Sequence, residues 1–189
     1  MDLDAMIDAL RASGPHPDLG DRLELFGQFV GAWDVDVTTI GPDGTRTEMP
    51  GEWHFGWSLD GRAVVDVFIV PRRSLRDTAG AGVYGVTVRF FDPSIDAWRC
   101  TWVGPTGGVV ALFIARRTGD EITLERGAEG GALDRWIFSR ITPTRFHWRA
   151  AESTDGGATW AIAQEMVARR AAPQTMGDTA RDESRGGDG

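Results

Sequence analysis

The stretch that decides the fold covers residues 51–70 and reads GEWHFGWSLDGRAVVDVFIV. Apolar and polar residues alternate on both sides of SLDGR, which predicts a β-hairpin with its turn at this motif. The loop could hold two residues, or three with Gly61 in the left-handed conformation and Ser58 opposite Arg62. We favour the three-residue loop, because that register keeps the apolar residues of both strands on one face.

This register gives the hairpin an apolar face and a polar face. The apolar face carries Trp53, Phe55, Trp57, Ala63, Val65, Val67 and Ile69. On the polar face His54 lies opposite Asp66, with Glu52 two residues away. A carboxylate beside an imidazole selects its tautomer and raises its basicity, as a general base requires. His54, Asp66 and Glu52 are therefore the candidate catalytic residues, and the alternative is an ion pair on the outer surface of the sheet.

The rest of the chain predicts an all-β protein, a single antiparallel meander barrel of about ten strands with a short N-terminal helical segment. Residues 1–28 show helical apolar spacing, and residues 29–170 alternate in short segments between Gly, Pro and Asp turn motifs. Such a long meander avoids open sheet edges by closing into a barrel. Residues 171–189 are polar and without apolar periodicity, so we expect a disordered tail.

Composition narrows the class of function. The net charge of −8 disfavours nucleic acid, and a single cysteine excludes an internal disulfide. No apolar run reaches the roughly 18 residues of a membrane span. We therefore expect a cytoplasmic protein without nucleic-acid or membrane partners, and a homodimer stays open. We expect no cofactor and no metal, because three scattered histidines and one cysteine show no ligand spacing.

Large aromatic and charged side chains are candidates for a ligand site. Eight tryptophans against one tyrosine could fill a wide sheet interior or wall a pocket. We expect Phe91 to pair with Trp98, which sets Arg89 between Trp98 and Trp102. There Arg89 could hold a carboxylate or an aromatic acid, or it could lie on the outer surface. The candidate ligand-binding residues are Trp53, Trp57, Arg89, Trp98, Trp102, Arg135, Trp148 and Gln164.

Gly31-Ala32-Trp33 opens the first predicted strand, directly after the helical segment. A G-x-W motif in this position resembles the lipocalin and wider calycin barrels. The resemblance implies that Trp33 closes one end of the barrel, beneath a basic side chain from the last strand. Arg169 or Arg170 would supply that side chain through a cation–π contact.

Further motifs extend the resemblance. Residues 153–160, STDGGATW, match the Asp-box pattern S-x-D-x-G-x-T-W, a turn held by side-chain hydrogen bonds. Together with W-H-F-G-W-x-L-D-G-R-A-V-x-D, the VRFFDPSIDAWR turn and Arg135-Trp136, this motif resembles a bacterial family of lipocalin-like domains of unknown function. The resemblance spans about residues 25–170. It implies the barrel fold and no established activity.

The outline is also similar to nitrobindin-type haem barrels, which use a late histidine as axial ligand. His147 is the late histidine of this chain, and it shares a strand face with Arg145 and Arg149. Such a face is typical of a solvated strand, so we favour a surface position for His147 over haem binding.

Three functions stay open at this point. The leading one is binding of a small, largely apolar or aromatic molecule inside a Trp-rich barrel. The alternative is a cofactor-free acid–base enzyme, an isomerase, lyase or cyclase, that uses His54 with Asp66. The third is a barrel with a packed interior that serves as a structural or partner-binding unit. The position of the polar hairpin face, in a cavity or in solvent, separates them.

Overall fold

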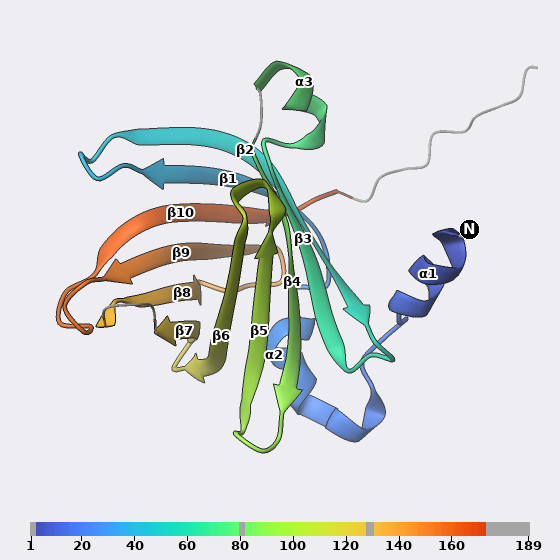
Figure 1. Cartoon of the computed structure of the whole chain (residues 1–189). Helices are drawn as coiled ribbons and strands as arrows, with labels where there is room; N and C mark the ends of the chain where they lie inside the picture. The colour runs from blue at the N-terminus through green and yellow to red at the C-terminus, as the bar shows by residue number, and fades with distance from the viewer. Residues whose placement is uncertain (1–2, 80–81, 128–130, 173–189) are drawn as a thin grey trace, which may run out of the picture.

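The computed structural model of the chain describes residues 3–79, 82–127 and 131–172. They form a closed barrel of ten antiparallel strands in which each strand pairs with its neighbours in the chain and β1 pairs with β10 (Figure 1). The predicted all-β meander barrel is thereby confirmed. The strands are β1 (Gly31–Ile40), β2 (Arg46–Ser58), β3 (Ala63–Val70), β4 (Val83–Asp92), β5 (Ala97–Gly104), β6 (Val109–Thr118), β7 (Glu121–Gly127), β8 (Leu133–Ser139), β9 (Arg145–Ser153) and β10 (Ala161–Arg170).

Short helices precede the barrel and interrupt two of its connections. The predicted N-terminal helical segment contains α1 (Leu3–Leu10), η1 (Pro17–Leu23) and α2 (Glu24–Gly27). The connections after β3 and β5 contain η2 (Arg73–Leu75), α3 (Arg76–Ala79) and η3 (Pro105–Gly107). None of the described helices is long and apolar enough to cross a membrane. Most of the predicted tail, residues 173–189, lies outside the described residues.

Residues 23–29, which include α2, close one end of the barrel, and we call this segment the plug. Its side chains Leu23, Phe26 and Phe29 are buried. The ring of Phe26 packs edge-on against Trp98 and Phe138, at centroid distances of 5.0 and 6.0 Å. The apolar spacing of the N-terminal segment thus places its large side chains inside the barrel, where they remove this end from water.

Trp33 and Arg170 complete the closure of this end. The guanidinium carbon of Arg170 lies 4.2 Å from the centre of the Trp33 ring, which confirms the predicted contact. The Trp33 indole donates to the Phe29 carbonyl at 2.7 Å. Arg170 also donates to the carbonyl oxygens of Gln28 and Val30. One side chain from the last strand therefore ties the first strand to the plug.

The β2–β3 hairpin has a longer loop than predicted. Ser58 pairs with Ala63, so residues 59–62 form a four-residue loop. Gly61 has a φ of 71°, as predicted for the left-handed position. The predicted three-residue loop is wrong, and so is the pairing of Ser58 with Arg62.

Hydrogen bonds from the N-terminal segment stabilise this loop. The Leu59 amide donates to the Leu10 carbonyl, and the His16 amide donates to the Gly61 carbonyl. The Ser58 hydroxyl also donates to the Leu10 carbonyl. Because these partners are remote in sequence, the hairpin motif alone carries no signal of the longer loop.

The additional loop residue moves the side chains of β3 to the other face relative to β2. Asp66 lies opposite Phe55 and points into the barrel, where it is completely buried. His54 lies opposite Val67 on the outer face. The predicted pairing of His54 with Asp66 is therefore wrong. The β3 residues that share the interior with Trp53 and Phe55 are Val64, Asp66 and Phe68.

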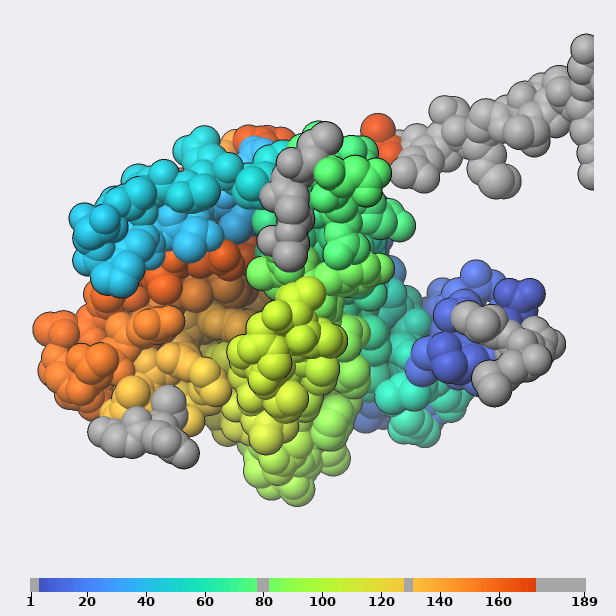
Figure 2. Space-filling view, turned by 45° about the horizontal axis from the view of Figure 1, so that its top comes forward, coloured from blue at the N-terminus to red at the C-terminus, as the bar shows by residue number. Residues whose placement is uncertain are grey.

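The barrel interior beside the plug is filled by packed aromatic rings. There the ring of Phe146 lies 4.8 Å from Phe29 and 4.7 Å from Trp33, centroid to centroid. Towards the other end, Trp102 and Trp136 face inward but are only half-buried. The surface is recessed between β2 and β6, and residues of β8 to β10 lie behind the recess (Figure 2). One end is packed, and the interior remains accessible from the other.

Candidate functional site

Aromatic rings form the wall of the barrel opposite the plug. Trp136 on β8 is the central ring, with centroids 6.1 Å from Trp102, 4.3 Å from Phe113 and 5.4 Å from Trp148. Glycine creates the space for Trp102, because a Cβ at Gly85 on the adjacent strand would overlap its ring. We call Trp102, Phe113, Trp136 and Trp148 the tryptophan wall.

Polar side chains border the tryptophan wall. Arg126 and Asp134 face each other across β7 and β8 and form an ion pair, with 32% and 20% of their side chains exposed. The guanidinium carbon of Arg126 lies 5.5 Å from the centre of the Phe113 ring. On β10, Gln164 donates to the hydroxyl of Thr39 at 3.3 Å. Arg126 and Asp134 were not predicted as site residues, because only the strand register brings them together.

Two hydrogen-bond donors at the tryptophan wall have no partner among the described residues. They are the indole nitrogen of Trp148 and the Nε atom of Arg126, and both atoms are buried. Buried polar groups normally find a partner, so each unpaired donor requires an explanation. Small-molecule sites combine apolar walls with a few polar groups, so these two donors make the tryptophan wall a candidate ligand site.

A buried ion pair joins the neighbouring strands β3 and β4 on the inner face of the barrel. Asp66 accepts from Arg89 through one carboxylate oxygen and from the Trp53 indole at 2.7 Å through the other. The guanidinium carbon of Arg89 lies 5.1 Å from the Phe26 ring centre. Burial lowers the pKa of Arg89 to about 10, so the guanidinium stays charged at neutral pH. Both residues were predicted site residues, but their pairing was not predicted, because the expected register placed Asp66 on the same face as His54.

The lone cysteine lies beside this ion pair. Cys100 is opposite Arg89 in the β4–β5 ladder and is buried. Burial raises the pKa of its thiol to about 12, against the lowering effect of the Arg89 charge. At neutral pH the thiol therefore stays protonated, and it is a poor nucleophile.

The structure separates the predicted ligand-binding residues. Trp102 and Gln164 lie around the accessible end of the interior, whereas Trp53, Arg89 and Trp98 are packed deep inside it. Trp148 is as buried as the second group and contacts both Trp53 and Trp136. Trp57 is half-buried against Gly27, beside the N-terminal segment.

Unlike the other predicted ligand-binding residues, Arg135 lies on the outer face of the barrel, on β8. There its guanidinium group stacks on Trp160 at 4.0 Å and pairs with Glu125.

Glu52 and His54 form a separate cluster outside the barrel. His54 Nε2 lies 3.0 Å from a carboxylate oxygen of Glu52, and the Arg73 side chain and amide donate to the same carboxylate at 2.9 and 2.7 Å. Partial burial raises the pKa of Glu52, but the hydrogen bonds from Arg73 and His54 lower it to about 2. The surrounding cavity measures about 980 Å³. Asp66 lies on the opposite side of this sheet, away from the cluster.

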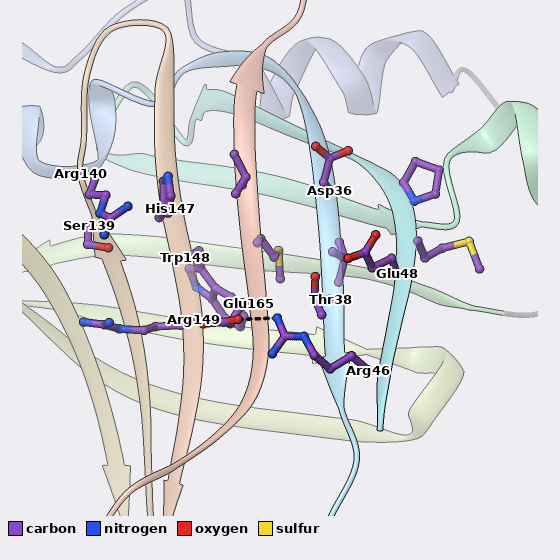
Figure 3. A pocket seen from close by; sticks show the side chains of 15 residues that line it. Asp36, Thr38, Arg46, Glu48, Ser139, Arg140, His147, Trp148, Arg149 and Glu165 are labelled. Atoms are coloured by element: carbon purple, nitrogen blue, oxygen red, sulfur yellow. Dashed lines mark hydrogen bonds and ion pairs between the residues drawn. The ribbon is translucent and has the colours of Figure 1, made fainter. Parts of the chain in front are cut away.

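A second outer groove of about 790 Å³ crosses strands β2, β1, β10, β9 and β8 (Figure 3). Its surface is polar, and Arg46 pairs with Glu165 across it at 2.9 Å. Burial lowers the pKa of His147 in this groove, as do the nearby charges of Arg140 and Arg145. Because it lines this outer groove, His147 lies on an outer strand face, as predicted. Within the described ranges, no group of His, Cys, Asp and Glu could hold a metal ion.

Comparisons with known proteins identify the fold. No protein-family model and no curated protein matches the chain. The structure is similar to the S-type phycobiliprotein lyase from Guillardia theta, with 12% identity and a TM-score of 0.55 over 79% of this chain and 92% of that one.

Two other solved structures are less similar. A redesigned β-barrel bound to DFHBI has 15% identity and a TM-score of 0.38, over 76% of this chain and 95% of its own. A protein of unknown function from the DUF3598 family of Nostoc punctiforme has 10% identity and a TM-score of 0.25, over 79% and 99%. At 12% identity, the likeness to the lyase concerns the fold alone. The chain has the architecture of a lipocalin-like barrel.

Proposed function

We propose that this protein binds a small, largely apolar or aromatic molecule at the accessible end of its barrel. One observation carries the proposal: Trp102 and Trp136 face the interior and are still partly exposed to solvent. Removing apolar surface from water contributes about 25 cal/mol per Å². A ligand that covers these rings therefore gains binding energy, because it removes apolar ring surface from water.

The layout of the interior supports the proposal. Small-molecule sites are concave and mostly apolar, with a few polar groups that orient the ligand. The tryptophan wall supplies the apolar surface, and Arg126 and Gln164 supply polar groups beside it. The plug around α2 closes the opposite end of this interior. A phycobiliprotein lyase shares the fold, but a shared fold does not carry over a substrate.

The structure does not support the alternative of an acid–base enzyme that uses His54 together with Asp66. The two side chains lie on opposite faces of the sheet. Asp66 is also committed to Arg89 and Trp53 in the interior, so it has no access to a proton on a substrate in the outer groove. General acid–base catalysis needs hydrogen-bond reach between the base, its partner and the substrate.

Ligand titration of the Trp102→Ala variant tests the proposal. We expect 1-anilinonaphthalene-8-sulfonate and 2-ethylnaphthalene to change the tryptophan fluorescence of the wild type in a saturable way. Trp102→Ala should weaken both by about tenfold, because it removes one aromatic face of the site. Trp160→Ala is the matched control, since Trp160 stacks on Arg135 outside the barrel. Absence of saturable binding, or equal effects of the two substitutions, would contradict the proposal.

A further inference from the structure

We propose that the preferred ligand is a planar aromatic compound that carries a neutral carbonyl group. Its ring packs on the tryptophan wall, and its carbonyl oxygen accepts from the unpaired donors of Trp148 and Arg126. This inference rests on the proposed function, and it adds the chemical class of the ligand.

A missing hydrogen-bond partner distinguishes the Trp148 indole from three other indoles of the chain. Trp33 donates to the Phe29 carbonyl, Trp53 donates to Asp66, and Trp160 donates to the Gly157 carbonyl. Trp148 is as deeply buried as Trp53, but its indole nitrogen has no partner among the residues that the structure describes. A buried indole N–H without a partner is destabilising, so a ligand that supplies an acceptor here would gain a hydrogen bond that the folded chain leaves unmade.

The two unpaired donors belong to the same end of the barrel. Trp136 connects them, because its ring lies 5.4 Å from Trp148 and 4.3 Å from Phe113, and Arg126 lies over Phe113. A planar molecule packed on Trp136 therefore lies beside the ring of Trp148 and in the neighbourhood of the Arg126 guanidinium group. Trp136 is half-buried, so a ligand can approach it.

The donor set determines the complementary group. Indole and guanidinium nitrogens donate hydrogen bonds and accept none, so the ligand must supply an acceptor. Asp134 already offsets the charge of Arg126, and the whole chain carries a net charge of −8. A carboxylate would face this negative charge without an unpaired cation beside it. A neutral carbonyl oxygen accepts from both donors without that repulsion.

Three matched naphthalenes test the inference on the full-length protein by calorimetry. The compounds are 2-acetonaphthone with a neutral carbonyl, 2-ethylnaphthalene without an acceptor, and 2-naphthoate with a negative charge. We expect 2-acetonaphthone to bind about tenfold more tightly than 2-ethylnaphthalene, because only the ketone satisfies a buried donor. We expect 2-naphthoate to bind no more tightly than the ketone.

Trp148→Phe removes the indole donor and keeps an aromatic ring. It should abolish the preference for the ketone and leave the affinity for 2-ethylnaphthalene within about threefold. Trp160→Phe is the matched control, because it removes an indole N–H outside the barrel, and it should keep the preference. Arg126→Lys preserves the ion pair with Asp134 and removes Nε as a donor, so it should reduce the preference as well.

The outcomes separate the inference from the proposed function. Equal affinities of the wild type for the ketone and the hydrocarbon would overturn the carbonyl preference and leave aromatic binding in place. Tighter binding of 2-naphthoate than of the ketone would overturn the neutral class. A preference that survives in Trp148→Phe would overturn the role of that indole. Failure of all three compounds to bind would overturn the proposed function itself.

Discussion

At the scale of single residues, the buried Asp66 and Arg89 are the most consequential pair in the barrel. Both side chains are completely buried, and the Asp66 carboxylate is held by Arg89 and by the Trp53 indole. Desolvation offsets much of the attraction between two buried charges. Loss of one partner is different, because it leaves the other charge buried and unpaired.

Asp66→Asn should therefore destabilise the protein by about 3–5 kcal/mol, as measured by urea unfolding. The double variant Asp66→Asn with Arg89→Met should recover most of this loss, because it removes the unpaired cation together with its partner. A single variant that loses less than about 1 kcal/mol would show that Arg89 does not depend on Asp66.

Glu52 gives a residue-scale prediction for pH. Its pKa is about 2 in the folded protein and 4.5 ordinarily, so the folded state favours the carboxylate. The corresponding stabilisation is present above pH 4.5 and is lost as the pH falls towards 2. The free energy of unfolding of the wild type should exceed that of Glu52→Gln at neutral pH, and the difference should disappear near pH 2.

Arg73 supplies the control for this pH dependence. It donates to Glu52 through its side chain and its backbone amide. In an Arg73→Ala background, Glu52→Gln should show a much weaker dependence on pH. An unchanged dependence would show that Arg73 is not the main cause of the lowered pKa.

At the scale of elements, the contact between the N-terminal segment and the β2–β3 hairpin stabilises the four-residue loop and with it the register of β3. The amides of His16 and Leu59 hold the loop against this segment. Gly61 makes the contact possible, because a Cβ there would overlap the Gly14 carbonyl oxygen and lie 2.7 Å from the His16 amide nitrogen. The loop and the segment therefore depend on each other.

Gly61→Ala and Gly44→Ala form a matched test of this contact. Gly44 has a φ of 82° and open space around it, so alanine there carries only the strain of the left-handed backbone. We expect a loss of about 1 kcal/mol for Gly44→Ala and of about 2–3 kcal/mol for Gly61→Ala in urea unfolding. Equal losses would mean that the N-terminal segment moves away without cost.

At the scale of the whole molecule, the outer face of β4 to β6 is notably apolar. Val110 and Leu112 are 64% and 70% exposed, and Phe90 and Tyr84 are also exposed on this face. Outer faces of antiparallel sheets are usually polar, and large apolar patches favour association. The homodimer that the sequence left open is still a prediction, and this face is where we place its interface.

Sedimentation velocity of the wild type and of Leu112→Arg tests that prediction. We expect the wild type to sediment as a dimer at micromolar concentration and Leu112→Arg as a monomer, because an arginine at the interface would bury an unpaired charge. Arg117→Ala, on the same strand but away from the apolar residues, should sediment like the wild type. A monomeric wild type would contradict the prediction.

The sequence by itself determined the barrel, because the signals for a meander are local. Alternating apolar residues and short turn motifs define ten strands, and closure follows from the need to pair the sheet edges. The contact of Trp33 with Arg170 followed from the resemblance of the G-x-W motif to lipocalin barrels. The pairing of Phe91 with Trp98 was predictable from the length of the turn between them. So was the left-handed conformation of Gly61, which its turn motif requires.

Only the tertiary structure decided which polar side chains enter the barrel. The β2–β3 register depends on hydrogen bonds from Leu10 and His16, which lie far from the hairpin in sequence. A shift of one residue moved Asp66 inside, away from His54, because successive side chains of a strand point to opposite faces. The unpaired indole of Trp148 likewise became visible only when all strands were packed around it, since a missing hydrogen bond leaves no mark in a sequence.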